Sequence, residues 1–401
     1  MRVEILCTGD EILTGKTINT NYSHVSRRLG EVGLEVHWGT TVGDDRAALL
    51  QAFRQAGERS DAVIVNGGLG PTVDDLSQEV AAQAAGVELV LSDLWLERMT
   101  QSYARRGRVM PANNRKQAML PADCEFIDNP IGTACGFALT IGKARFFFTP
   151  GVPREMRRMI DEQVIPRLLA LSGIKGVTRL KRFHSFGVGE SRADEMLSNI
   201  AGLADGSIKL GFQAHFPELE TKLAARGGDE AALAAKLAPI EAEIRKRLGN
   251  FIIAEDDQTL EGVVLAKLQA GGYTLAVAEG VTGGTLAARL APLGGADKVF
   301  RCGVVNLDLR KLVSAEELRR DSGASHALRV AVQLDEGPER PDWGATITIA
   351  IADAKGSTRR EARLIGNRDW VRAGAVELGL DCLRRHLASL PVDERIDFER
   401  R

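Results

Sequence analysis

The chain has 401 residues, which suggests two or three domains of roughly 150 residues each. Hydrophobic residues make up 44% and charged residues 26%, and the formal net charge is -2, so nothing points to a nucleic-acid or membrane partner. Five scattered cysteines without CxxC spacing argue against a disulfide framework and a structural zinc site. Without a signal-like start or a long apolar run, we expect a cytoplasmic protein with no membrane span.

Strands and helices alternate over the first part of the chain. Short apolar runs typical of strands take turns with segments of helical spacing, at 3–7, 21–29, 34–41, 46–56, 62–65, 76–85 and 145–148. This alternation predicts an α/β domain over residues 1–170 with a doubly wound, mostly parallel sheet.

The rest of the chain predicts two further domains. Residues 171–250 show a βαββα pattern, with strands at 180–186, 208–213 and 220–225 and helices at 190–200 and 230–248. We expect a small connecting α/β domain that acts as a spacer. Residues 251–401 begin a new α/β pattern, with helices at 259–270, 285–290 and 369–390 and strands at 274–278 and 346–352.

The sequence GGLGPTVDD at residues 67–75 follows the third predicted strand and precedes a helix. Its glycines let backbone N–H groups approach a ligand closely, and a strand-to-helix loop of this kind makes a concave anion site. The adjacent carboxylates of Asp74 and Asp75 would repel a phosphate unless a hard cation lay between them. The loop therefore predicts a metal–phosphate site, and the alternative is a tight turn in which Asp caps the helix.

Two more acidic loops follow predicted strands, at Asp10-Glu11 and at Asp44-Asp45. Each alone is more typical of a solvated turn or a helix cap. In a parallel sheet, however, all three acidic loops emerge at one edge, which indicates a metal or a polar ligand. Such a metal would activate water and stabilise phosphoryl charge.

Seven motifs in order resemble the competence/damage-inducible protein A (CinA) family: TGDEILTG, TN, VGDD, GGLGPTVDD, NRKQA, NPIGTACGF and TPGVPREM. The resemblance implies a molybdopterin-binding-like first domain that hydrolyses ADP-ribose with Mg, Mn or Co, and a homodimer. It implies catalytic roles for Asp10, Glu11, Asp44, Asp74 and Asp75, of which Asp44, Asp74 and Asp75 would hold the metal. It also implies a substrate-binding set, namely Gly67, Gly68, Gly70, Pro71, Thr72, Asn114, Lys116, Gly132 and Thr133.

In the same family the third domain is a nicotinamide-nucleotide amidase, whose nucleophilic serine follows a glutamate. Here Glu279 is followed by Gly280, and glycine cannot form an acyl intermediate. The family's tyrosine is replaced by Leu307, and residues 331–344 have lost most of a Gly-rich loop. We expect an amidase-like domain without amidase activity. Thr282 is a poor substitute nucleophile, since no base is evident nearby in the sequence.

The leading hypothesis from sequence is therefore a metal-dependent hydrolase that converts ADP-ribose, or a related nucleotide diphosphate, to AMP and ribose 5-phosphate. One alternative is a non-catalytic protein that binds a nucleotide or a pterin phosphate. Another is residual amidase activity in the third domain.

Overall fold

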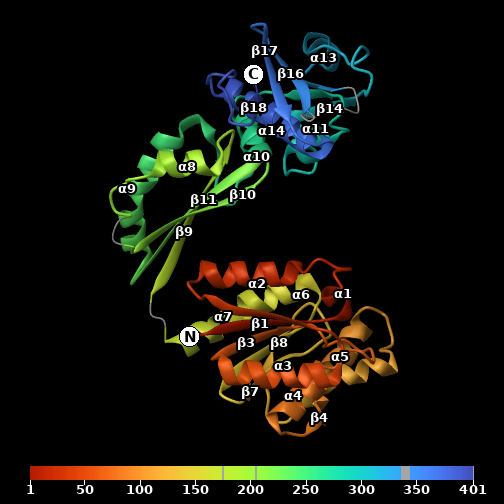
Figure 1. Ribbon diagram of the computed structural model, residues 1–401. Coiled ribbons are helices and arrows are strands. Elements are labelled where there is room, and N and C mark those ends of the chain that lie inside the picture. Colours follow the sequence, from red (N-terminus) through yellow and green to blue (C-terminus); the bar gives the residue numbers. More distant parts are fainter. Residues whose placement is uncertain (174–175, 204–205, 336–343, 401) are drawn as a thin grey trace. The chain divides into compact units, whose positions relative to one another are not determined.

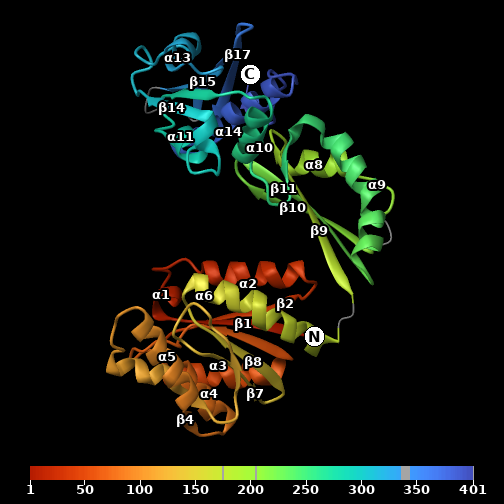
Figure 2. The same cartoon turned by 180° about the vertical axis from the view of Figure 1, so that it is seen from behind.

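In the computed structural model, residues 1–173, 176–203, 206–335 and 344–400 are described, and the chain divides into two compact units, Met1–Thr178 and Arg179–Arg401 (Figures 1 and 2). Each unit has cores of its own. Among the described residues, no helix combines the length and the apolar character that a bilayer crossing requires.

The first unit is built on a six-stranded sheet in the order β2-β1-β3-β8-β7-β6. Its strands are β1 Val3–Thr8, β2 Val36–Val42, β3 Ala62–Asn66, β6 Glu125–Ile127, β7 Gly136–Ile141 and β8 Ala144–Thr149. The pairs among β2, β1, β3 and β8 are parallel, whereas β7 and β6 each pair antiparallel with their neighbours. The predicted mostly parallel sheet is confirmed, with an antiparallel edge that the sequence did not reveal.

Helices cover both faces of this sheet, as a doubly wound fold requires (Figure 1). Residues of β1 alternate between the two layers: Val3 and Ile5 pack with α2 and α6, and Leu6 packs with α3. The elements outside the sheet are α1 Asp10–Leu13, α2 Thr20–Glu31, α3 Arg46–Arg59, α4 Ser77–Ala85, β4 Leu89–Leu91, α5 Asp93–Arg105, η1 Ala112–Ala118, β5 Met119–Pro121, α6 Pro153–Met159, η2 Ile160–Val164 and α7 Ile165–Ser172.

The second unit begins with the predicted βαββα segment. Its elements are β9 Val177–Phe186, α8 Glu190–Leu197, β10 Ile208–His215, β11 Glu218–Gly227 and α9 Glu230–Leu248. After the short helix η3 Gly249–Phe251, β12 Ile252–Glu255 pairs antiparallel with β9 and completes a sheet in the order β10-β11-β9-β12. Residues 252–255 therefore belong to the middle sheet, whereas the sequence pattern placed the start of the last domain at residue 251.

The last domain is a mixed α/β sheet in the order β14-β13-β15-β16-β17-β18. The pairs β14–β13 and β13–β15 are parallel and the remaining pairs are antiparallel. Helices α10 and α14 pack in the core on one face, and α13 contributes to the Ala-rich core of the other. The elements are α10 Leu260–Ala270, β13 Leu275–Glu279, α11 Thr285–Leu290, α12 Ala296–Val299, β14 Phe300–Val305, α13 Ala315–Ser322, β15 His326–Leu334, β16 Gly344–Ala352, β17 Ser357–Ile365, α14 Arg368–Leu387 and β18 Glu399–Arg400.

The middle domain makes contacts with residues from the last few positions of the chain. Asp397 accepts a hydrogen bond of 2.8 Å from the backbone N–H of Gly189, just before α8, and pairs with Arg192 at 2.5 Å. The ring of Phe398 lies 5.7 Å from that of Phe186 at the end of β9. The middle domain is therefore contacted by residues that lie about 140 positions beyond its own last strand.

Candidate functional site

A cavity of about 560 Å³ lies where β1, β2 and β3 end, and the three acidic loops meet there. The sequence-predicted residues that line it are Glu11, Asp44, Gly67, Gly68, Gly70, Pro71, Asp74, Asp75, Asn114 and Thr133. The other lining residues are Thr8, Gly9, Leu69, Tyr103, Gln117, Ala134, Pro150, Gly151, Val152 and Glu155. Asp10, Thr72, Lys116 and Gly132 were also predicted at the site but are not among the lining residues.

Glycine is needed at position 67 because the chain turns sharply against β1. Gly67 has a φ of 111°, where L side chains are strained. A Cβ added there would lie 2.5 Å from Oγ1 and 2.8 Å from the backbone oxygen of Thr8. The loop backbone therefore runs against the end of β1, and any larger residue would push it toward the cavity.

Asp10 and Asp44 join two of the acidic loops to each other. The backbone N–H of Asp10 donates to Oδ2 of Asp44 at 3.1 Å, and the N–H of Asp44 donates to Oδ1 of Asp10 at 3.1 Å. Burial raises the pKa of Asp44, and the carboxylates of Asp10, Glu11 and Asp74 raise it further against the opposing effect of the Asp10 N–H. Asp10 thus positions the loop, and Asp44 faces concentrated negative charge.

Thr72 and Lys116 hold the Gly-rich loop from outside the cavity. The N–H of Thr72 donates to Oδ2 of Asp75 at 2.9 Å, and its hydroxyl donates to the same oxygen. The ammonium of Lys116 donates to the Thr72 carbonyl at 2.7 Å and lies 3.7 Å from Glu79. These bonds use Oδ2 of Asp75, which lines the cavity, and give Lys116 a structural role.

Gln117, which sequence reasoning missed, positions several residues of the wall. Its buried side chain accepts hydrogen bonds from Asn114 at 2.9 Å and from Thr133 at 3.0 Å, and it donates to the Leu69 carbonyl at 3.1 Å. The NRKQA motif contained Gln117, but only the fold shows that it reaches three separate segments.

Glu155 is a second lining residue that the sequence did not single out. Its Oε2 accepts a hydrogen bond of 2.8 Å from Asn129, whose Oδ1 in turn accepts one of 2.9 Å from the N–H of Gly132. Gly132 therefore supports the wall through Asn129. Glu155 lies within the TPGVPREM motif, and this motif was the sequence feature that could have pointed to a role for it.

The electrostatic character of the cavity is strongly negative. Five lining residues are carboxylic acids, at positions 11, 44, 74, 75 and 155, and no lysine or arginine lines it within the described chain. The buried Oγ1 of Thr8, also on the wall, has no hydrogen-bond partner among the described residues. Oxygen atoms concentrated in this way fit a hard divalent cation, and the glycine backbone fits a phosphate beside it.

The position of the missing amidase nucleophile lies against the side chain of Leu309. A Cβ at Gly280 would lie 2.8 Å from Cδ2 of Leu309. Glu279, fully buried at the end of β13, accepts hydrogen bonds from the hydroxyl of Thr282 at 2.7 Å and from two N–H groups of α11 at 3.1 Å. Thr282 is itself fully buried. Most of the altered Gly-rich loop, residues 336–343 with Gly337 to Pro341, lies outside the described residues.

Comparison with known proteins matches three successive parts of the chain to family models. Residues 4–170 match the model "Probable molybdopterin binding domain", residues 180–254 match "Damage-inducible protein CinA KH domain", and residues 257–311 match "CinA C-terminal domain". A CinA-like protein of Geotalea uraniireducens is 34% identical over 99% of this chain and 100% of its own length. The chain belongs to the CinA-like protein family.

Other members of the family are similar over almost the whole chain. The CinA-like protein of Shewanella sediminis is 36% identical, with 96% of each chain covered. Among solved structures, the protein CinA of Thermoplasma acidophilum is 34% identical over 41% of this chain and 98% of its own, with a TM-score of 0.39. The molybdopterin biosynthesis enzyme MoaB of Thermus thermophilus is 21% identical over 43% and 97%, with a TM-score of 0.30.

Proposed function

We propose that the cavity at the ends of β1, β2 and β3 hydrolyses the pyrophosphate bond of a nucleotide diphosphate, with ADP-ribose as the leading substrate. The observation that supports this proposal is a set of five carboxylates around a glycine-rich loop, with no lysine or arginine among the described residues of the wall. A diphosphate cannot enter such a field alone, so it enters with a divalent cation, Mg²⁺, Mn²⁺ or Co²⁺.

The residues of the chain divide the work as follows. Asp44, Asp74 and Asp75 would hold the cation, which would supply Lewis-acid stabilisation of phosphoryl charge. Backbone N–H groups of the 67–70 loop donate to the phosphate oxygens. Glu11 or Glu155 accepts a proton from the attacking water.

The reaction balances with water as the only co-substrate. The water oxygen bonds to one phosphorus, the bridging P–O bond breaks, and the products are AMP and ribose 5-phosphate. Tyr103 lines the same cavity and offers an aromatic face on which a nucleobase can stack. The polar side chains of Asn114 and Thr133, both held by Gln117, provide further contacts for a sugar.

A direct assay tests the proposal. The purified chain is mixed with ADP-ribose and each of the three cations, and AMP is measured by chromatography. We expect turnover that falls about 100-fold or more in Asp74→Asn, which keeps the side-chain shape but removes the charge. Asp123→Asn is the control, because this exposed residue lies in a turn with a φ of 58° that asparagine tolerates.

Two results would count against hydrolysis. Absence of AMP with all three cations would refute it. Thermal stabilisation by a nucleotide or pterin phosphate without product would instead favour a binding protein, the alternative suggested by the match to a probable molybdopterin-binding domain.

For the last domain we propose a fold without amidase activity. Gly280 supplies no nucleophile, and the hydroxyl of the buried Thr282 already donates to Glu279. The purified chain is expected to release no ammonia from nicotinamide mononucleotide. Ammonia release above a no-enzyme control would show that residual amidase activity remains.

A further inference from the structure

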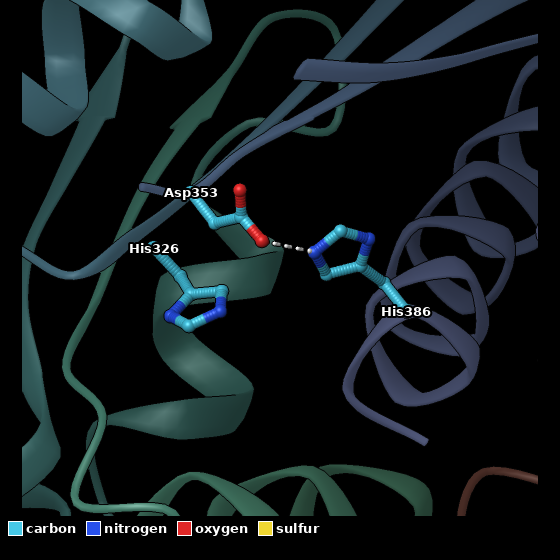
Figure 3. A group of neighbouring side chains, drawn as sticks. All are labelled: His326, Asp353 and His386. Carbon is cyan, nitrogen blue, oxygen red and sulfur yellow. Dashed lines mark hydrogen bonds and ion pairs between the residues drawn. The ribbon is translucent and has the colours of Figure 1, made fainter. Parts of the chain in front are cut away.

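Three side chains from distant parts of the last domain meet at one edge of its sheet. His326 is the first residue of β15, Asp353 directly follows β16, and His386 lies near the end of α14. Because β15 and β16 are antiparallel, with Ala327 opposite Ala352, the first two residues come together. Figure 3 shows the three side chains directed toward one another.

We propose that His326, Asp353 and His386 form a binding site for a divalent transition-metal ion, with Zn²⁺ as the first candidate. One possible ligand atom from each residue lies within 4.8 Å of those of the other two. Two imidazoles and one carboxylate match the three protein ligands of open zinc sites and of the 2-His-1-carboxylate iron sites. This site is independent of the pyrophosphatase cavity in the first unit.

The spacing of two of the ligand atoms already suits a metal. Nε2 of His386 lies 3.1 Å from Oδ2 of Asp353. Two ligand atoms about 2.0–2.1 Å from a tetrahedral ion lie roughly 3.3 Å apart. When the ion binds, the proton between these atoms leaves for solvent or moves to Nδ1, and small side-chain rotations bring the third ligand into range.

Hydrogen bonds from neighbouring residues orient His326 for this role. The Ser325 hydroxyl donates its single proton to the Thr274 carbonyl at 2.9 Å. Its oxygen, 2.9 Å from Nδ1 of His326, can then only accept, so the ring proton sits on Nδ1. Nε2 consequently keeps its lone pair, which is the tautomer that binds a metal.

Asp353 is oriented in the same manner. Its Oδ1 accepts hydrogen bonds from the N–H groups of Lys355 at 2.7 Å and Gly356 at 3.1 Å. Its Oδ2 remains directed at His386. Two of the three ligands therefore have the outer hydrogen bonds that usually fix metal-binding side chains.

An ion can reach the site from outside. Asp353 and His386 both line a cavity of about 500 Å³, and their side chains are 15% and 18% exposed. Three protein ligands leave a fourth position open toward water or a small molecule in this cavity. The site also differs from the family's amidase position, since His326 pairs with Leu275 and Gly280 lies five residues further, roughly 16 Å along β13.

The test uses the full-length chain, stripped of metal and kept in millimolar Mg²⁺ so that the acidic cavity of the first unit is occupied. Calorimetric titration with Zn²⁺ should show one equivalent bound, and Co²⁺ should give the visible absorption of a site with nitrogen ligands. The signal should be lost in His386→Gln, which removes one imidazole ligand and keeps a polar side chain beside Asp353. His215→Gln, an exposed histidine in the same unit, should bind like wild type.

Ser325→Ala provides a second readout, because it changes no ligand. Loss of its hydroxyl should weaken Zn²⁺ binding about 10- to 100-fold if it fixes the tautomer of His326. Zn²⁺ binding by His386→Gln equal to wild type, or no Zn²⁺ bound by the wild-type chain, would overturn the proposal. Neither result bears on ADP-ribose hydrolysis, so the two proposals fail separately.

Discussion

The replacement Gln117→Met tests whether one buried amide holds the walls of the acidic cavity in place. Methionine has nearly the same length and volume as glutamine, so packing in the η1 region is preserved. The three hydrogen bonds to Asn114, Thr133 and Leu69 are lost together. The variant therefore isolates the polar contribution of this side chain.

The expected cost follows from the three bonds. Each contributes about 1 kcal/mol, because Asn114 and Thr133 line an open cavity where water can replace part of the loss. The sum is about 3 kcal/mol for the unit Met1–Thr178. For a unit of this size, each kcal/mol lowers the melting temperature by about 2–4 °C, which predicts a decrease of about 6–12 °C.

Differential scanning calorimetry of the full-length chain measures the decrease, and hydrogen exchange locates it. Faster exchange should appear in peptides that cover 112–118 and 130–135. Gln101→Met is the matched control, since its amide is exposed and bonds only to Glu97 one helical turn away in the described structure. A Gln117→Met variant that melts within 2 °C of wild type, with unchanged exchange, would refute the reasoning.

Further predictions concern the loop, a buried acid and the missing nucleophile. Gly67→Ala adds a Cβ 2.5 Å from Thr8 Oγ1 at a φ of 111°, which should cost about 1–3 kcal/mol and weaken Mn²⁺ binding; wild-type melting would contradict this. Burial raises the pKa of Glu377 to about 7 from 4.5, so the folded chain binds this proton more tightly and its stability should fall as the pH rises from 4.5 through 7. Glu377→Gln should remove that dependence in urea unfolding, and equal pH slopes for both chains would argue otherwise. Gly280→Ser should release no ammonia from nicotinamide mononucleotide, because Leu309 must shift to admit the side chain and Glu279 is already bonded to Thr282; measurable release would show that a serine alone restores the site.

Sequence patterns predicted the helices and strands in which the apolar residues follow one regular spacing. The helix at Glu230–Leu248 and the helix at Thr285–Leu290 were predicted with the observed bounds. The strand β17, Ser357–Ile365, was missed because it carries four charged residues, one of which, Arg360, is buried by pairing with Glu399. An ion-pair partner that lies far along the chain cannot be recognised from the local pattern of apolar and charged residues.

The site residues likewise divide into those that local sequence patterns reveal and those that depend on contacts between distant segments. Asp44, Asp74 and Asp75 could be placed together from sequence because parallel strands end at one edge. The role of Gln117 depends on three segments that meet only in the fold. The group of His326, Asp353 and His386 has separations of 27 and 33 residues, which match no short metal-binding motif.

The contacts of Asp397 and Phe398 with the middle domain affect when parts of the chain can finish folding during synthesis. The first unit contains its own core within residues 1–178, so it can fold as it leaves the ribosome. The middle domain has its own core within residues 183–251, but its contacts with Asp397 and Phe398 need residues about 140 positions later, which at the usual rate of elongation take roughly 7–28 s to be made. During that interval the ring of Phe186 lacks its contact with Phe398 and the N–H of Gly189 lacks its bond to Asp397, so this part of the nascent chain stays open to chaperones and proteases.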